Sequence, residues 1–260
     1  MKKICYLILF VFTSVVSFSQ NLRIGIENGI SMPIFSISND NGFYKQSKFY
    51  LAENGTITAS YTFNNSVFIK SGLGYYTYSE KFFEKHSLND NHYNMFVNVK
   101  DLYKSLYIPL QIGYKQKLFS EFYLKYTSGV EFNLIFDKQY YAFNEDNLYY
   151  LDGNQVDRET MFLVRGIEYN MPYTLNSYKR NFNILFSNQL SLSYEIKKFM
   201  YIDLYAEYHA GLFKVVDNTG YIRTIDENNI VREYHPVITS NGSYWRIGLG
   251  IGYIFKNKKK

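Results

Sequence analysis

The chain has 260 residues and is rich in aromatic side chains, with 28 Tyr and 22 Phe. A disordered chain lacks the apolar content needed to fold, so this composition excludes disorder. Mean hydropathy is −0.26 and no apolar run reaches 18 residues, which excludes a protein that crosses a membrane with helices. The formal net charge of +5 at pH 7 is too small to argue for a nucleic-acid partner.

The N-terminus has the three parts of an export signal. Lys2 and Lys3 form a basic start, residues 4–18 are apolar, and Ser17 and Ser19 precede an expected cut after residue 19. The apolar stretch is shorter than the roughly 20 residues that a membrane-spanning helix needs. We therefore predict a cleaved signal peptide over residues 1–19 and an outer-membrane barrel domain over residues 20–260. Cleavage would remove the single cysteine, which excludes disulfides and thiol catalysis in the mature chain.

From residue 22 onward, apolar residues recur at every second position, the pattern of strands with one apolar face. The pattern predicts eight strands, most of them long enough for a tilted membrane crossing of roughly 9–11 residues. They cover residues 22–30, 57–63, 67–75, 106–114, 122–136, 182–194, 200–212 and 245–255.

The connections between these strands alternate in length. Tight links fall at residues 64–65, 118–120 and 197–198, and long polar segments fall at residues 31–54, 79–101, 137–179 and 215–242. This alternation is typical of an outer-membrane barrel with short periplasmic turns. We predict an all-β fold, an eight-stranded antiparallel up-and-down transmembrane β-barrel with long extracellular loops.

A soluble eight-stranded barrel would show the same alternation with its apolar face turned inward. Side-chain size separates the two, because an eight-stranded barrel has an interior only just wide enough for modest side chains. The apolar face carries bulky residues, whereas the opposite face holds ten of the 16 glycines, with the other six assigned to loops. The bulky face should therefore look outward, toward lipid. The ten glycines are Gly25, Gly29, Gly72, Gly74, Gly113, Gly129, Gly211, Gly248, Gly250 and Gly252.

The inward face also carries charges of both signs. The positive residues are Arg23, Lys70, Lys115, Lys125 and Arg246, and the negative ones are Glu27, Glu131, Glu195, Asp203 and Glu207. They could form an ion pathway or a proton relay, or they could pair in a packed ionic core. The packed core is favoured, because eight strands leave no open channel and buried charges need partners.

Three segments carry a family resemblance. The signal peptide ends Ser-Phe-Ser-Gln at Gln20, the strand around Pro109 reads Ile-Pro-Leu, and the final strand runs from Tyr244 to an aromatic end at Phe255. The chain thereby resembles the outer-membrane β-barrel family common in Bacteroidetes, a PorT-like or OmpA-like small barrel. The resemblance implies contact with outer-membrane lipid and the barrel-insertion machinery, and for some members a place in a protein-secretion and gliding apparatus. The family has no catalytic residues to transfer.

Glu207 and His209 share the inward face near the extracellular end of the seventh strand, and such a pair could orient a general base. The sequence places no serine beside them. Lipid A deacylase barrels present a His-x-Ser on a strand, whereas Ala210 and Gly211 follow His209 here. An interior histidine bonded to Glu207 or a tyrosine is favoured, and we predict no catalytic residue.

His86, Asp90 and His92 have a spacing that could bind a metal, but zinc sites need three or four convergent ligands. His235 is isolated. We predict no metal and no cofactor.

The segment 137–179 is rich in aromatic residues, which suit a recognition surface because Tyr supplies contact area at low entropic cost. The alternative is a ribbon in which the fifth and sixth strands extend beyond the membrane. The aromatic residues are Tyr140, Tyr141, Phe143, Tyr149, Tyr150, Tyr169, Tyr173 and Tyr178.

The sequence thus predicts a non-enzymatic integral protein of the outer membrane, acting as a structural or interaction subunit. A protein-secretion or surface-assembly complex is the candidate setting, with other envelope or secretion proteins as partners and no nucleic acid. The alternatives are a small passive pore and an envelope enzyme that modifies lipid.

Overall fold

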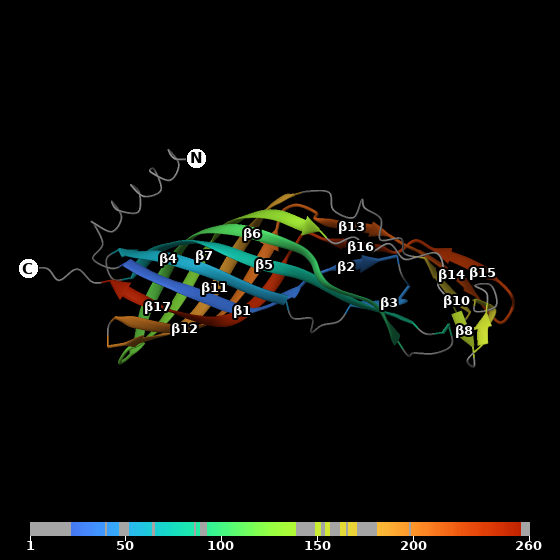
Figure 1. The fold of residues 1–260 in the computed structure, drawn as a ribbon, viewed down its shortest axis with the longest axis horizontal. Coiled ribbons are helices and arrows are strands. Elements are labelled where there is room, and N and C mark those ends of the chain that lie inside the picture. The colour runs from blue at the N-terminus through green and yellow to red at the C-terminus, as the bar shows by residue number, and fades with distance from the viewer. Residues whose placement is uncertain are drawn as a thin grey trace, which may run out of the picture.

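A computed structural model describes residues 22–39, 41–46, 52–63, 66–85, 87–88, 93–138, 149–151, 154–156, 162–164, 166–170, 181–197 and 199–255. Eight antiparallel strands form the barrel in the left half of Figure 1. They are β1 (Leu22–Pro33), β4 (Ala52–Phe63), β5 (Val67–Lys85), β6 (Tyr93–Phe119), β7 (Phe122–Lys138), β11 (Phe182–Ile196), β12 (Met200–Gly211) and β17 (Tyr244–Phe255). All eight predicted strands are confirmed. Of the three predicted short links, the one between β6 and β7 is described at residues 120–121, whereas residues 64–65 and 198 lie outside the described residues.

The barrel is closed. The strand order is β5-β4-β1-β17-β12-β11-β7-β6, and β5 also pairs with β6. The first and last barrel strands lie side by side, from the pair Leu22–Phe255 to the pair Pro33–Tyr244. Closure gives every barrel strand a paired neighbour on both edges, which a membrane-spanning sheet requires.

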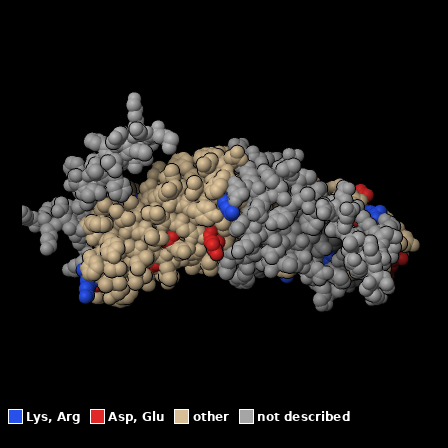
Figure 2. Space-filling view, viewed as in Figure 1, with Lys and Arg blue, Asp and Glu red and all other residues tan. Residues whose placement is uncertain are grey.

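The bulky apolar residues point outward, as predicted. On β17 the outward side chains from Trp245 to Phe255 are all exposed, and Leu249 is 60% exposed. Most of the barrel surface seen in Figure 2 is uncharged. Leu22, at the start of β1, was predicted to point outward but is buried. Within the described residues, no helix is long and apolar enough to span a membrane.

Inward glycines make room for the large side chains of the interior. A Cβ atom on Gly74 would lie 2.1 Å from the ring of Tyr107. Gly55 corrects the prediction that the apolar face has no glycine and that this residue is in a loop. It lies within β4 on the same face as Ile57, and a Cβ atom there would have nothing within 4 Å.

Two matched alanine substitutions test this packing. Gly74→Ala is expected to destabilise the barrel by about 1–3 kcal/mol, because the added methyl group displaces Tyr107 from a filled interior. Gly55→Ala should instead stabilise it by about 0.5–1 kcal/mol, because alanine loses less backbone entropy in a strand. Urea unfolding in lipid vesicles, followed by the fluorescence of Trp245, measures both. Equal midpoints for the two variants would contradict the inward packing of Gly74.

Pro109 interrupts the ladder between β5 and β6. The described pairs run through Ser71–Leu110 and resume at Gly74–Tyr107 in the same register. Proline has no backbone N–H to donate, which accounts for the missing pairs at this position.

The predicted loop over residues 79–101 is wrong. β5 and β6 continue as a paired ribbon beyond the barrel to the pair Lys85–Tyr93, with two register shifts on the way. Backbone pairing outside a membrane does not need an apolar face, so the loss of alternation at residue 79 did not mark the end of the strand. The short strand β3 (Tyr44–Gln46) adds to the outer edge of β5.

The other long segments also contain sheet. β2 (Ser36–Ser38), β13 (Val216–Thr219) and β16 (Val237–Ser240) form one small sheet. β10 (Ile167–Asn170), β14 (Tyr221–Ile225) and β15 (Val231–Tyr234) form a second, farther from the barrel (Figure 1). β8 (Tyr149–Leu151) pairs with β9 (Asn154–Val156).

Much of the aromatic segment 137–179, including Tyr140, Tyr141, Phe143, Tyr173 and Tyr178, lies outside the described residues. The sequence also allowed the fifth and sixth barrel strands, β7 and β11, to extend beyond the membrane as a paired ribbon. This ribbon is not seen in the described residues. There β11 begins only at Phe182, and the ribbon that extends the barrel is made by the third and fourth barrel strands.

Candidate functional site

The barrel interior brings nine of the ten predicted inward charges into ion pairs with one another, and the tenth, Glu131, lies against His209. In the periplasmic half, Arg23 pairs with Glu195, and Lys115 Nζ lies 3.2 Å from the same carboxylate oxygen. Lys125 pairs with Asp203. Each of these contacts joins two strands that are not neighbours in the sheet, so they fill the interior as well as neutralising charge.

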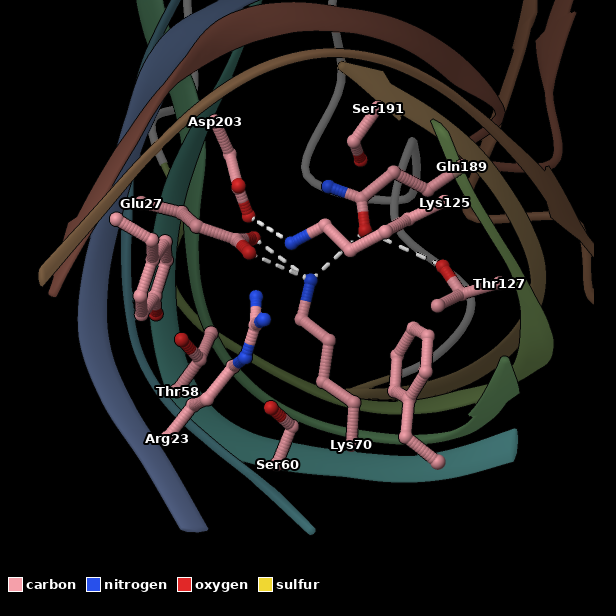
Figure 3. A pocket seen from close by; sticks show the side chains of 12 residues that line it. Arg23, Glu27, Thr58, Ser60, Lys70, Lys125, Thr127, Gln189, Ser191 and Asp203 are labelled. Atoms are coloured by element: carbon pink, nitrogen blue, oxygen red, sulfur yellow. Dashed lines mark hydrogen bonds and ion pairs between the residues drawn. The ribbon is translucent and has the colours of Figure 1, made fainter. Parts of the chain in front are cut away.

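Lys70 on β5 and Lys125 on β7 both reach toward the middle of the barrel (Figure 3). Lys70 Nζ lies 2.7 Å from Glu27 and donates a hydrogen bond of 2.8 Å to Gln189. The cavity between these residues has a volume of only about 20 Å³, close to the space that one water molecule needs. The packed ionic core is confirmed at this level.

The next level toward the extracellular side is centred on Arg246. Its guanidinium pairs with Glu207 and donates hydrogen bonds to Tyr107 and Thr56. Gln111 donates a hydrogen bond of 3.0 Å to Glu207. Arg246 is 3% exposed, so the pair is withdrawn from water on all sides.

His209 lies between two carboxylates. Its Nδ1 atom is 3.2 Å from Glu131, its Nε2 atom is 3.2 Å from Glu207, and its ring stacks on Tyr244 at 4.1 Å. The predicted interior position of His209 beside Glu207 is confirmed. Since both nitrogens face a carboxylate, neither is directed at a nucleophile.

Ser187 corrects the expectation that no serine stands beside His209. It is the cross-strand partner of His209 on β11, and its hydroxyl accepts a hydrogen bond of 2.8 Å from Gln111. The sequence could not show this, because the pairing depends on the register between two strands. Ser187 and His209 are both fully buried, so this cluster offers no route to a substrate.

Aromatic side chains close the barrel above this level. The rings of Tyr78 and Tyr103 stack at 4.6 Å, and those of Tyr76 and Tyr244 stack at 4.8 Å. The Tyr78 hydroxyl lies 2.6 Å from Ser240 Oγ in the small sheet of β2, β13 and β16. The extracellular mouth is thus plugged by tyrosines that bond to a segment folded over them.

The predicted metal ligands His86, Asp90 and His92 lie outside the described residues. Within the described residues, no three His, Cys, Asp or Glu side chains are grouped to hold a metal ion. His235 is exposed, and its ring lies 5.8 Å from that of Tyr221.

Comparison with known proteins gives structural neighbours only, because no protein-family model and no curated protein matches the sequence. The outer membrane protein OprG from Pseudomonas aeruginosa is 12% identical, with 92% of this chain and 97% of that chain covered and a TM-score of 0.47. Neisserial surface protein A is 10% identical, with 90% and 97% covered and a TM-score of 0.38. The outer membrane protease OmpT from Escherichia coli is 10% identical, with 92% and 98% covered and a TM-score of 0.33. No activity is transferred from these proteins.

The membrane location of the chain follows from the structure of the barrel. Its exterior is a belt of bulky apolar side chains, its interior is polar and ion-paired, and its strands close without a free edge. The chain is a transmembrane β-barrel of the outer-membrane type.

Proposed function

We propose that the protein is a non-enzymatic subunit of the outer membrane that acts through its extracellular surfaces. The observation that carries the proposal is the filled interior. Charged contacts fill the described barrel along its axis, from Glu195 near the periplasmic end to Glu131 near the extracellular end. Stacked tyrosines close the barrel above Glu131. A barrel filled in this way can contact partners through its surfaces, but it has no open path through its lumen.

Exposed apolar residues outside the membrane belt support a partner-binding surface. Leu163 and Val164 are 60% and 55% exposed, and Ile230 and Val231 are each 49% exposed. Ile225 joins the two segments, because its N–H donates a hydrogen bond to the carbonyl oxygen of Gly166 and it pairs with Val231. Exposed apolar side chains grouped beyond the lipid mark a candidate protein contact.

The resemblance to PorT-like barrels supports a proposal about the complex in which the protein acts. We propose a protein-secretion or surface-assembly complex as the place of this subunit, reached after cleavage of residues 1–19 and insertion by the barrel-insertion machinery. The aromatic segment 137–179 and the exposed pair Leu163–Val164 within it are the proposed partner face.

An affinity pull-down of the tagged protein from gently solubilised outer membranes tests this. We expect large partners in a fixed stoichiometry, and we expect Leu163→Asp with Val164→Asp to release them. A matched control is Leu118→Asp, since Leu118 is a 45% exposed apolar residue beside the periplasmic turn. A protein that elutes alone, or partner contacts that survive deletion of residues 140–175, would remove the proposed role of this segment.

The pore alternative makes a different prediction. Because the space between Lys70 and Lys125 is about 20 Å³, a purified barrel in a planar bilayer should show no steady single-channel openings. Steady ohmic openings would contradict the closed interior. A Lys70→Ala and Lys125→Ala variant, which empties this level, serves as the comparison.

A further inference from the structure

The charges of the barrel interior are unevenly distributed along its axis. In the extracellular half, Arg246 and His209 face Glu131 and Glu207, two basic groups against two carboxylates. In the periplasmic half of the described barrel, five basic side chains face three carboxylates. The basic residues are Arg23, Lys70, Lys115, Lys117 and Lys125, and the acidic ones are Glu27, Glu195 and Asp203.

The unmatched positive charge is concentrated at the periplasmic mouth. Lys70 and Lys125 each have a carboxylate of their own, whereas Arg23 and Lys115 contact the same oxygen of Glu195. Arg23 is 5% exposed, and its Nη1 atom finds no hydrogen-bond partner within the described part of the chain. A buried guanidinium nitrogen without an acceptor is costly, so this nitrogen is available to donate to a bound anion.

These residues line a recess. It has a volume of about 370 Å³ and is lined by Arg23, Lys115, Lys117, Tyr123 and Glu195, with the hydroxyls of Thr62 and Ser66. Glu121 in the neighbouring turn does not line it. The volume falls within the roughly 300–1,000 Å³ typical of small-molecule sites.

The basic groups of the recess are held in place before any ligand arrives. Lys115 Nζ lies 4.5 Å from the centre of the Tyr123 ring while it contacts Glu195. The Arg23 guanidinium lies 5.3 Å from the Tyr201 ring. Side chains fixed in this way lose little conformational entropy on binding, which favours affinity.

We propose that the periplasmic mouth of the barrel is a binding site for a small soluble oxyanion, carrying phosphate or carboxylate groups. Arg23 and Lys115 supply charge-assisted donors at the base of the recess, and Lys117 supplies a further positive charge at its rim. The ligand enters from the periplasm and is retained there, because the level of Lys70 and Lys125 above it is filled. Most residues that line the recess are charged or polar, which favours a soluble ligand over a lipid.

Calorimetric titration of the mature protein in a nonionic detergent tests the site at low ionic strength. The probes are inorganic pyrophosphate and succinate, which separate a preference for phosphate from one for carboxylate. We expect saturable binding of at least one probe at one site per chain. Lys115→Gln and Lys117→Gln should each weaken it about tenfold or more, as expected for the loss of a charged contact of about 1.4 kcal/mol or more.

Lys214→Gln is the matched control, since Lys214 is an exposed lysine paired with Asp217 at 3.6 Å outside the barrel interior. Its affinity should equal that of the unmodified protein. Lys117 is exposed, so Lys117→Gln tests the site even if substitution of the more enclosed Lys115 disturbs folding. Absence of saturable binding of both probes at millimolar concentration, or equal affinities for Lys117→Gln and Lys214→Gln, would overturn the proposal.

Discussion

Placing arginine at Leu249 is expected to destabilise the folded barrel in lipid vesicles by about 2–4 kcal/mol. Leu249 lies in the middle of β17, faces outward and is 60% exposed. In water such a substitution would be tolerated, but within the apolar belt it forces a guanidinium into hydrocarbon. Urea titration of folding into vesicles, read by the fluorescence of Trp245, measures the difference.

Ile230→Arg provides the matched control. Ile230 is a large apolar residue of similar exposure, 49%, but it lies beside β15 in the second small sheet, outside the belt. Its substitution should change stability by less than about 0.5 kcal/mol. Equal losses for the two variants would mean that the outward face of β17 does not contact lipid.

Replacement of Arg246 by methionine is expected to destabilise the barrel by about 3–5 kcal/mol, because it leaves the Glu207 carboxylate buried without its main counter-charge. The same substitution removes the hydrogen bonds from Arg246 to Tyr107 and Thr56. The same urea titration in vesicles measures the loss.

A second substitution separates charge from packing. Arg246→Met combined with Glu207→Gln should recover part of the loss, because the remaining group is neutral and can still bond to Gln111. Lys214→Gln, which breaks an exposed pair with Asp217, should cost less than about 1 kcal/mol. If the double variant were as unstable as the sum of the two single variants, the ion pair would not be the source of the stability.

The strands and their facing could be predicted because alternation is a local property. The apolar residues from Trp245 to Phe255 are two positions apart, so a single strand already defines which side meets lipid. The charges on the opposite side, such as Glu27 and Asp203, then had to lie inside. The formation of ion pairs could also be predicted, though not which charge pairs with which, since a narrow barrel cannot hold isolated charges.

Contacts between residues on different strands could not be predicted from such a local pattern. Ser187 meets His209, and Lys115 shares Glu195 with Arg23, only because of the register between neighbouring strands and the diameter of the barrel. The ribbon that ends at Lys85 and Tyr93 and the small sheets above the barrel also depend on pairings between distant segments. The strands of the small sheets have only three to five residues, too few for a local pattern to detect.

The pairing of β1 with β17 has a kinetic consequence. Hairpins such as β11–β12 can form as soon as their turns are made, but β1 keeps one unpaired edge until the last barrel strand arrives. Joining the two ends of so long a segment carries the largest loop-closure cost in the molecule and should limit the folding rate. Until that step, the open sheet exposes the edges of β1 and β12 to any other chain, and a polypeptide that stops before Tyr244 stays in this aggregation-prone form.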